Sequence, residues 1–165
     1  MIPEIKKILY ATDLSKNAQY AFGYAASLAN RYDAKITIVH VLEDVSSGSL
    51  SLVSHIIGEK RWVELKQKHI QEVLDMVSER LNQFCSEVSE SFKECPFIVE
   101  DIIAKQGEAV QVILDLVENT GYDIVVVGSH GHGILAGTLM GSTSRRIVRR
   151  CKKPVLVVRL PEDDS

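Results

Sequence analysis

Residues 122–144 read "YDIVVVGSHGHGILAGTLMGSTS", and this stretch decides how the rest of the chain is interpreted. It begins as a short apolar run that ends at Gly128, which is typical of a buried strand in a parallel sheet. Five glycines lie at positions 128, 131, 133, 137 and 141, no Lys or Arg separates them, and three hydroxyl residues close the stretch. Such a stretch is either a solvated loop or a place where the backbone approaches a ligand.

Four further segments have the composition of buried strands, and amphipathic patterns separate the five. The predicted strands are residues 5–11, 34–42, 97–105, 122–128 and 154–160. Strands that alternate with helices indicate right-handed βαβ units and one parallel sheet covered on both faces. We therefore predict an α/β fold: a doubly wound, five-stranded parallel sheet of the Rossmann-like or flavodoxin-like kind, with strand order 3-2-1-4-5.

The segments between the strands carry helix signals of unequal clarity. Ser15 is a good N-cap for a first helix, and Gly121 is a good stop for the helix that precedes the fourth strand. Residues 43–58 mix serines and glycines with exposed-looking apolar residues, so we predict a long irregular connection there. Residues 59–91 predict one long amphipathic helix whose packed face includes His69.

Size and charge narrow the possible classes of protein. The 165 residues fit one domain, residues 1–160, followed by an acidic tail, residues 161–165, that we expect to be disordered. The net charge of −3 argues against a nucleic-acid partner and an anionic membrane surface. No apolar run approaches the roughly 18 residues that a membrane span needs. The three cysteines form no disulfide framework, so we expect a cytoplasmic protein.

Chemistry-bearing residues gather where two neighbouring strands are expected to end. Asp13 follows the first strand and Gly128 ends the fourth, and ligands of such sheets bind at the carboxyl edge. Glycines let successive backbone amides point at phosphate oxygens, and a helix that opens at Ser142, Thr143 and Ser144 favours an anion at its N-terminus. Asp13 can accept from ribose hydroxyls or help to hold a divalent cation; its other interpretation is a helix cap, for which Ser15 is better placed.

The spacing of three of the glycines resembles a known nucleotide-binding motif. Gly128-x-x-Gly131, nine residues, and Gly141-Ser142 are similar to the G-2x-G-9x-G-[S/T] motif of the universal stress protein family, in its nucleotide-binding branch. The blocks "ILYATDLS", "ITIVHVL" and "GSTSRRIVRRCKKPVLVV" also resemble that family, so the likeness extends over residues 5–159. The P-loop signature does not fit, because no Lys precedes a Ser or Thr after the glycines.

The resemblance implies an adenine-nucleotide site and a homodimer that pairs through the last strand, residues 154–160. The implied ligand is ATP, ADP or AMP, with Mg²⁺ or Mn²⁺ held at Asp13 through the nucleotide. The family places the base against Val41 and the end of the first strand. The residues that the resemblance assigns to the site are Ala11, Thr12, Asp13, Val41, Val127, Gly128, His130, Gly131, Gly141, Ser142, Thr143 and Ser144.

Two departures from the family pattern bear on the ligand. Ala11 stands where many members have proline, and His132 is the one basic residue between the second and third motif glycines. The number of phosphates is therefore open. The implied role is a stress-response sensor or regulatory module with no catalytic residue. The alternatives are a slow ATPase and a dimeric interaction protein without a ligand.

Overall fold

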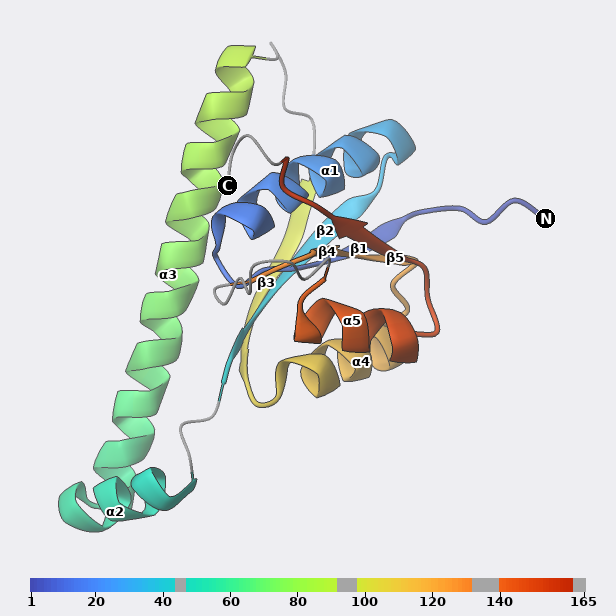
Figure 1. Ribbon diagram of the computed structural model, residues 1–165. Coiled ribbons are helices and arrows are strands. Elements are labelled where there is room, and N and C mark those ends of the chain that lie inside the picture. Colours follow the sequence, from blue (N-terminus) through green and yellow to red (C-terminus); the bar gives the residue numbers. More distant parts are fainter. Residues whose placement is uncertain (44–46, 92–97, 132–139, 162–165) are drawn as a thin grey trace.

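The structure is a computed structural model that describes residues 1–43, 47–91, 98–131 and 140–161 (Figure 1). Its strands are β1 (Lys7–Ala11), β2 (Lys35–Leu42), β3 (Ile98–Gln106), β4 (Ile124–Gly128) and β5 (Val155–Val158). Its helices are α1 (Lys16–Tyr32), α2 (Ser47–Ile57), α3 (Glu59–Ser91), α4 (Ala109–Thr120) and α5 (Ser142–Arg150). The strands form a five-stranded sheet in the order β3-β2-β1-β4-β5, and every neighbouring pair is parallel, which confirms the predicted fold and order.

The helices cover the sheet in two layers (Figure 1). On one face, α1 and α3 pack against a core that includes Ile8, Ile36 and Ile38. On the other face, α4 and α5 pack against a second core that includes Leu9 and Val125. Alternate residues of each strand enter opposite cores because side chains in a strand alternate between the two faces. Because both faces of the sheet are covered, the strand sequences are almost continuously apolar.

The start of α1 and the end of α4 follow the predicted signals. Ser15 caps α1, its side chain accepting from the Ala18 amide at 3.1 Å. Gly121 ends α4 in the left-handed conformation, with φ of 75°. Tyr10 fixes α1 on the sheet, because its hydroxyl donates to the Ala18 carbonyl at 2.5 Å. Burial raises the pKa of Tyr10 well above its ordinary value, so this donor keeps its proton.

The predicted irregular connection over residues 43–58 is wrong, since most of it forms α2. Leu52, Val53 and Ile56 recur at helical spacing, and this periodicity outweighs the local serine content. Gly58, with φ of 87°, then lets the chain turn directly from α2 into α3. The amides of Gly58 and Trp62 continue the hydrogen bonding through this corner, donating to the Ser54 and Gly58 carbonyls. Residues 44–46 lie outside the described part of the chain.

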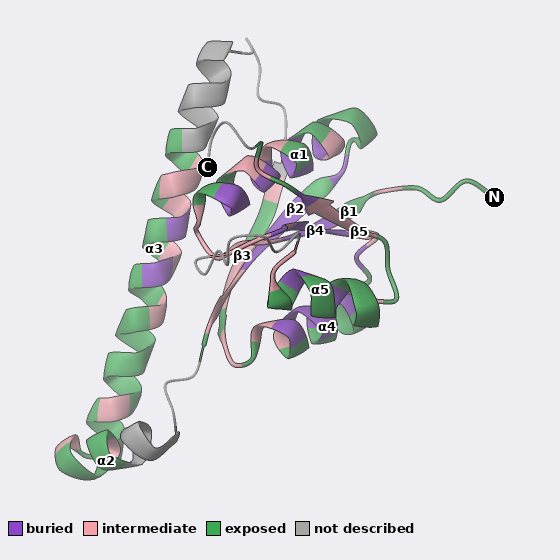
Figure 2. Ribbon diagram, viewed as in Figure 1, coloured by how far each residue is buried: buried purple, intermediate pink, exposed green. Residues whose placement is uncertain are grey.

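The extent of α3 is predicted correctly, but the extent of its packed face is not. Val73 and Val77 are buried, whereas His69 and Leu65 are exposed (Figure 2). The cause is length: 33 helical residues span about 50 Å, whereas the nine residues of β3 span about 30 Å. The apolar face of α3 is therefore longer than the sheet on which it packs, and its first turns have no sheet surface to cover. The prediction that His69 is packed is wrong for this reason.

Candidate functional site

A cavity of about 450 Å³ opens at the carboxyl edge of the sheet, next to the ends of β1 and β4. That volume is within the range of small-molecule sites. All the site residues expected from the sequence line this one cavity: Ala11, Thr12, Asp13, Val41, Val127, Gly128, His130, Gly131, Gly141, Ser142, Thr143 and Ser144. These residues come from strand ends, loops and the start of a helix. The topology brings them together, because the carboxyl ends of parallel strands share one edge of the sheet.

The floor of the cavity is apolar. Val39 and Val127, which are 1% and 4% exposed, belong to the core between the sheet and the α4–α5 layer, and Ala11 and Val41 pack against that core. Ile113 of α4 lines the same cavity. The cavity is thus an open end of this core rather than a separate surface groove. A flat apolar group can rest here without leaving a buried polar atom unpaired.

The loop that follows β1 presents Asp13 at the rim of this floor. The Thr12 amide donates to the Val39 carbonyl at 2.9 Å, and the Thr12 carbonyl lies 2.8 Å from Nδ1 of His40. Asp13 Oδ1 accepts from the Ser15 amide at 3.0 Å. The cap of α1 is Ser15, as predicted, so the Asp13 carboxylate closes the turn before the helix and does not cap it.

Atoms of the protein itself leave little room for a side chain at the three motif glycines. A methyl group at Gly131 would lie 2.3 Å from Oδ2 of Asp13, and one at Gly128 would lie 2.8 Å from Oδ1 of Asn17. A methyl group at Gly141 would approach the Ser129 carbonyl to 3.1 Å. Positive φ is not the reason, because left-handed conformations are found at Gly58, Gly107 and Gly121 instead. Close packing around Asp13, Asn17 and Ser129 therefore selects glycine at these positions.

Sequence reasoning missed Asn17, which ties three elements of the site together. Asn17 is 6% exposed; its Oδ1 accepts from the His130 amide at 2.8 Å, and its Nδ2 donates to the Val158 carbonyl at 3.2 Å. The side chain thus joins the start of α1 to the ends of β4 and β5. A signal was available, because Asn17 shares a helical face with the buried Ala21 and a polar residue on such a face needs a partner.

The N-terminus of α5 closes one side of the cavity. Gly141 precedes the helix without a side-chain cap, and its amide donates to the Ser129 carbonyl at 2.6 Å. The buried Ser144 hydroxyl donates to the same carbonyl at 2.9 Å, so it fixes the loop. Ser142 and Thr143 are exposed in the first helical turn. Amides at a helix N-terminus and nearby hydroxyls suit an anion.

The described lining of the cavity holds two carboxylates but no permanently charged cation. Asp13 and Glu43 line it together with two histidines, and none of its described lining residues is Lys or Arg. Arg145 donates to the Met140 carbonyl at 3.1 Å, and Arg146 pairs with Glu108 at 2.8 Å. Within the described part of the chain, no group of three His, Cys, Asp or Glu residues could hold a metal ion. A bound anion would therefore rely on amides, hydroxyls and a metal that it brings with it.

The sequence matches the universal stress protein family over residues 4–159. This chain belongs to that family. Universal stress protein A homolog 2 of Coxiella burnetii is 31% identical over 157 residues, which cover 94% of this chain and 95% of the relative. A second relative is the universal stress protein MJ0577 of Methanocaldococcus jannaschii, whose structure is solved. Its sequence is 28% identical and its structure superposes with a TM-score of 0.69, over 97% of this chain and 99% of the MJ0577 chain.

Two more distant universal stress proteins share the fold and were solved with nucleotides. One is a complex with cAMP, 21% identical with a TM-score of 0.62, covering 96% of this chain and 100% of its own. The other, from Arabidopsis thaliana, has AMP bound, is 17% identical with a TM-score of 0.56, and covers 96% of this chain and 94% of its own. Among the described residues of this universal stress protein, no helix is long and apolar enough to span a membrane.

Proposed function

We propose that this universal stress protein binds an adenine nucleotide in the cavity at the carboxyl edge of the sheet and acts as a regulatory module in a stress response. The observation that carries the proposal is the meeting of three surfaces in one cavity: the apolar floor, the Asp13 loop and the N-terminus of α5. These surfaces match the base, the sugar and the phosphate of a nucleotide in chemical character. The nucleotides in the related cAMP and AMP complexes support the same ligand class.

The arrangement of the three surfaces suggests one orientation of the ligand. The base would rest on Ala11, Val41 and Val127, where burial of a ring meets no unpaired polar group. The ribose would face Asp13, whose carboxylate accepts hydrogen bonds from hydroxyls. The phosphate would reach Gly141 and the first turn of α5, where the helix dipole favours negative charge.

The charge of the cavity bears on the number of phosphates. A triphosphate brings about four negative charges to a rim that already holds Asp13 and Glu43. ATP therefore needs Mg²⁺ or Mn²⁺, with Asp13 placed to help hold the ion, whereas AMP needs less compensation. We infer that omission of the metal weakens binding of ATP much more than binding of AMP.

Calorimetric titration with AMP, ADP and ATP, each with and without Mg²⁺, tests this function. We expect binding of at least one of them, and a protein saturated at about 100 times Kd should gain about 2.7 kcal/mol in the free energy of unfolding. The absence of heat and of thermal stabilisation with all three at millimolar concentration would refute the proposal. Release of phosphate from ATP, measured in parallel, separates a binding module from a slow ATPase.

The proposal includes a cytoplasmic homodimer that pairs through β5. In the described part of the chain this strand pairs on one side with β4, and Val155, Leu156 and Val157 are half-buried, so its outer edge offers backbone groups to a second copy. Sedimentation equilibrium would show twice the chain mass if the edge pairs in solution. A monomer at all concentrations would contradict this part of the proposal without touching nucleotide binding.

A further inference from the structure

Arg80 of α3 reaches the loop that carries Asp13. Its guanidinium Nη1 donates to the Leu14 carbonyl, although the two residues are 66 positions apart in the sequence. Arg80 is half-buried, and the neighbouring helical residues Val77 and Leu81 face the same place. The contact comes from α3, whereas the helical residues that line the nucleotide cavity belong to α4 and α5, apart from Ala18 of α1. Arg80 therefore touches the Asp13 loop from the side opposite the cavity.

Leu14 has an unusual backbone conformation. Among the described residues other than glycine, Leu14 and Asp33 have positive φ, at 65° and 51°. Asp33 is the C-cap of α1, a common place for that conformation. Leu14 is not at a helix C-terminus, and an apolar side chain has no hydrogen bond to favour the left-handed region. Something else has to hold Leu14 there.

The contacts of Leu14 explain how the conformation is held. Its amide donates to Oγ1 of Thr12 at 3.0 Å, its side chain packs against the α1–α3 core, and its carbonyl accepts from Arg80. A strained residue persists where its surroundings over-determine it, and such residues gather at functional sites. The residue before it is Asp13, whose Oδ2 lies against Gly131. The position of Leu14 thus sets where the Asp13 carboxylate lies.

A second, small cavity of about 30 Å³ lies on the Arg80 side of the same loop. Thr12, Leu14 and Arg80 line it, and Thr12 also lines the large cavity. The loop is therefore a thin wall with the nucleotide cavity on one side and α3 on the other. A change in how α3 packs would reach Asp13 through this wall.

We propose that Arg80 is a positioning residue for the nucleotide site: by holding the Leu14 carbonyl it keeps Asp13 in place for the ligand, and it makes nucleotide affinity depend on the packing of α3. The inference rests on the proposed function, because it assigns a further residue to the same site. The dependence is reciprocal, since a nucleotide that favours the native Asp13 loop also favours the docked α3 by the same factor.

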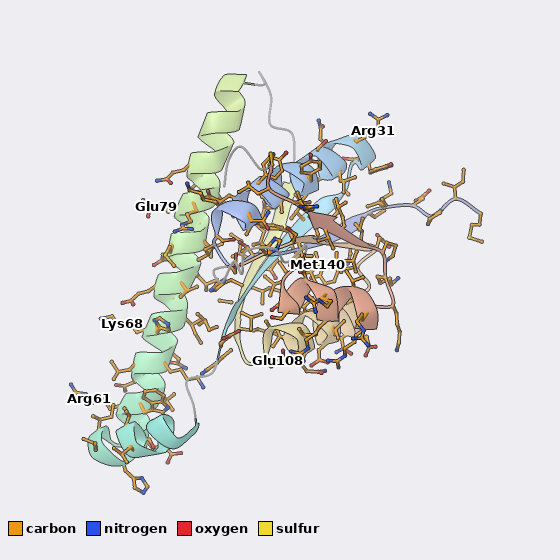
Figure 3. The ribbon with its side chains drawn as sticks, viewed as in Figure 1. Arg31, Arg61, Lys68, Glu79, Glu108 and Met140 are labelled. Carbon is orange, nitrogen blue, oxygen red and sulfur yellow. The ribbon has the colours of Figure 1, made fainter. Side chains whose placement is uncertain are left out.

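The test compares nucleotide affinity in Arg80→Met, Arg80→Lys and Arg61→Met. Methionine keeps the apolar stem and removes the donor, so we expect affinity to fall roughly tenfold, the effect of losing one charge-assisted hydrogen bond that orders the site. Lysine keeps one donor and should restore part of the loss. Arg61 lies on the same helix but is exposed, pointing away from the sheet (Figure 3), so Arg61→Met should bind like wild type. Circular dichroism and thermal unfolding establish that each variant is folded.

A double-mutant cycle with Asp13→Asn separates positioning from simple support of the fold. If Arg80 acts through Asp13, Arg80→Met should cause no further loss of affinity in the Asp13→Asn background. Leu14→Gly accepts the left-handed conformation without help, so the Arg80→Met effect should also shrink there.

The outcomes of this test distinguish the inference from the proposed function. Unchanged affinity in Arg80→Met, or an equal loss with and without the Asp13 carboxylate, would overturn the inference and leave nucleotide binding intact. A wild-type protein that binds none of the nucleotides would overturn both.

Discussion

Replacing Gly131 by alanine adds one methyl group next to Asp13 and tests how the site is built. The new Cβ would lie 2.3 Å from Oδ2 of Asp13, whereas ordinary contacts begin at 3.4 Å, so the carboxylate must move by about 1 Å. Alanine itself is compatible with the backbone here, because Gly131 does not have positive φ. The perturbation is therefore confined to the carboxylate.

The expected effect is large for binding and small for stability. A displaced carboxylate loses its hydrogen bond to the ligand, which costs about 1.5–3 kcal/mol, or roughly 10- to 100-fold in Kd. The side chain of Asp13 can rotate away from the methyl group, so the free energy of unfolding should change by less than about 1 kcal/mol. Calorimetric titration and urea unfolding of the same preparation measure the two quantities side by side.

A second background decides whether the effect passes through Asp13. In Asp13→Ala the carboxylate is already absent, so adding Gly131→Ala should change the affinity little. Wild-type affinity in Gly131→Ala would refute the reasoning. A full loss that persists in the Asp13→Ala background would show instead that the methyl group meets the ligand directly.

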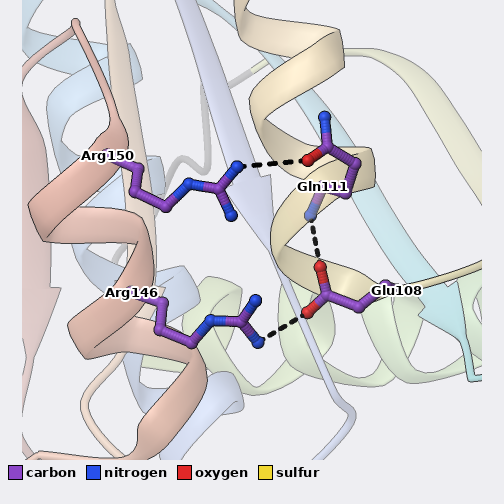
Figure 4. Close-up of polar contacts among 4 residues, drawn as sticks. All are labelled: Glu108, Gln111, Arg146 and Arg150. Atoms are coloured by element: carbon purple, nitrogen blue, oxygen red, sulfur yellow. Dashed lines mark hydrogen bonds and ion pairs between the residues drawn. The ribbon is translucent and has the colours of Figure 1, made fainter.

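The remaining predictions concern stability and use urea unfolding. Gly128→Ala should cost roughly 1–3 kcal/mol, because its methyl group would lie 2.8 Å from the Asn17 amide, which is bonded at both ends and cannot rotate; an unchanged midpoint would contradict this. Asn17→Ala should lower the free energy of unfolding by roughly 2–3 kcal/mol, since the His130 amide and the Val158 carbonyl lose their buried partner. A decrease as small as that of a surface substitution, within about 0.5 kcal/mol, would contradict this role of Asn17. Glu108→Ala should cost about 1 kcal/mol at pH 7, because Glu108 caps α4 and pairs with Arg146 of α5 (Figure 4). Desolvation raises the pKa of Glu108, but the Gln111 and Val110 amides and Arg146 together outweigh it and hold the pKa below its ordinary value of 4.5. The stabilisation is therefore present at neutral pH and is lost as the pH falls through the lowered pKa, so the difference between wild type and Glu108→Ala should narrow toward pH 3, and a constant difference would contradict it.

The fold could be predicted because each strand is a short apolar run and an amphipathic segment separates each strand from the next. The order of the strands was predicted from the doubly wound architecture, in which the first and fourth strands are neighbours that flank the crevice, and the residues that follow these two strands agree with it. The error over residues 43–58 arose from giving serine content more weight than periodicity. The error at His69 arose because a pattern in the sequence shows that a helix is amphipathic but not how far the surface beneath it extends.

The residues of the site that could be predicted are those that come directly after a strand or at the start of a helix. The position of Asn17 on the apolar face of its helix indicated that it needs a partner, but its partners, the His130 amide and the Val158 carbonyl, are backbone groups far away in the sequence that no residue type identifies. Leu14 and Arg80 could not be found from sequence, because nothing about leucine predicts a left-handed conformation and no pattern joins positions so far apart. The predicted tail lies largely outside the described residues, as does His132. Nucleotide binding, the identity of the nucleotide and the role of a metal at Asp13 stay predictions.

The hydrogen bond from the Gly141 amide to the Ser129 carbonyl bears on the spacing of the glycine motif. This bond holds the two ends of the segment between Gly131 and Gly141 close together through contacts of the protein alone. Closing a loop becomes only slowly more expensive with length, about 0.6 kcal/mol for each doubling. The sheet would therefore accept a segment of quite different length between the same two ends. A separation of nine residues is therefore a weak requirement of the two ends that this segment connects.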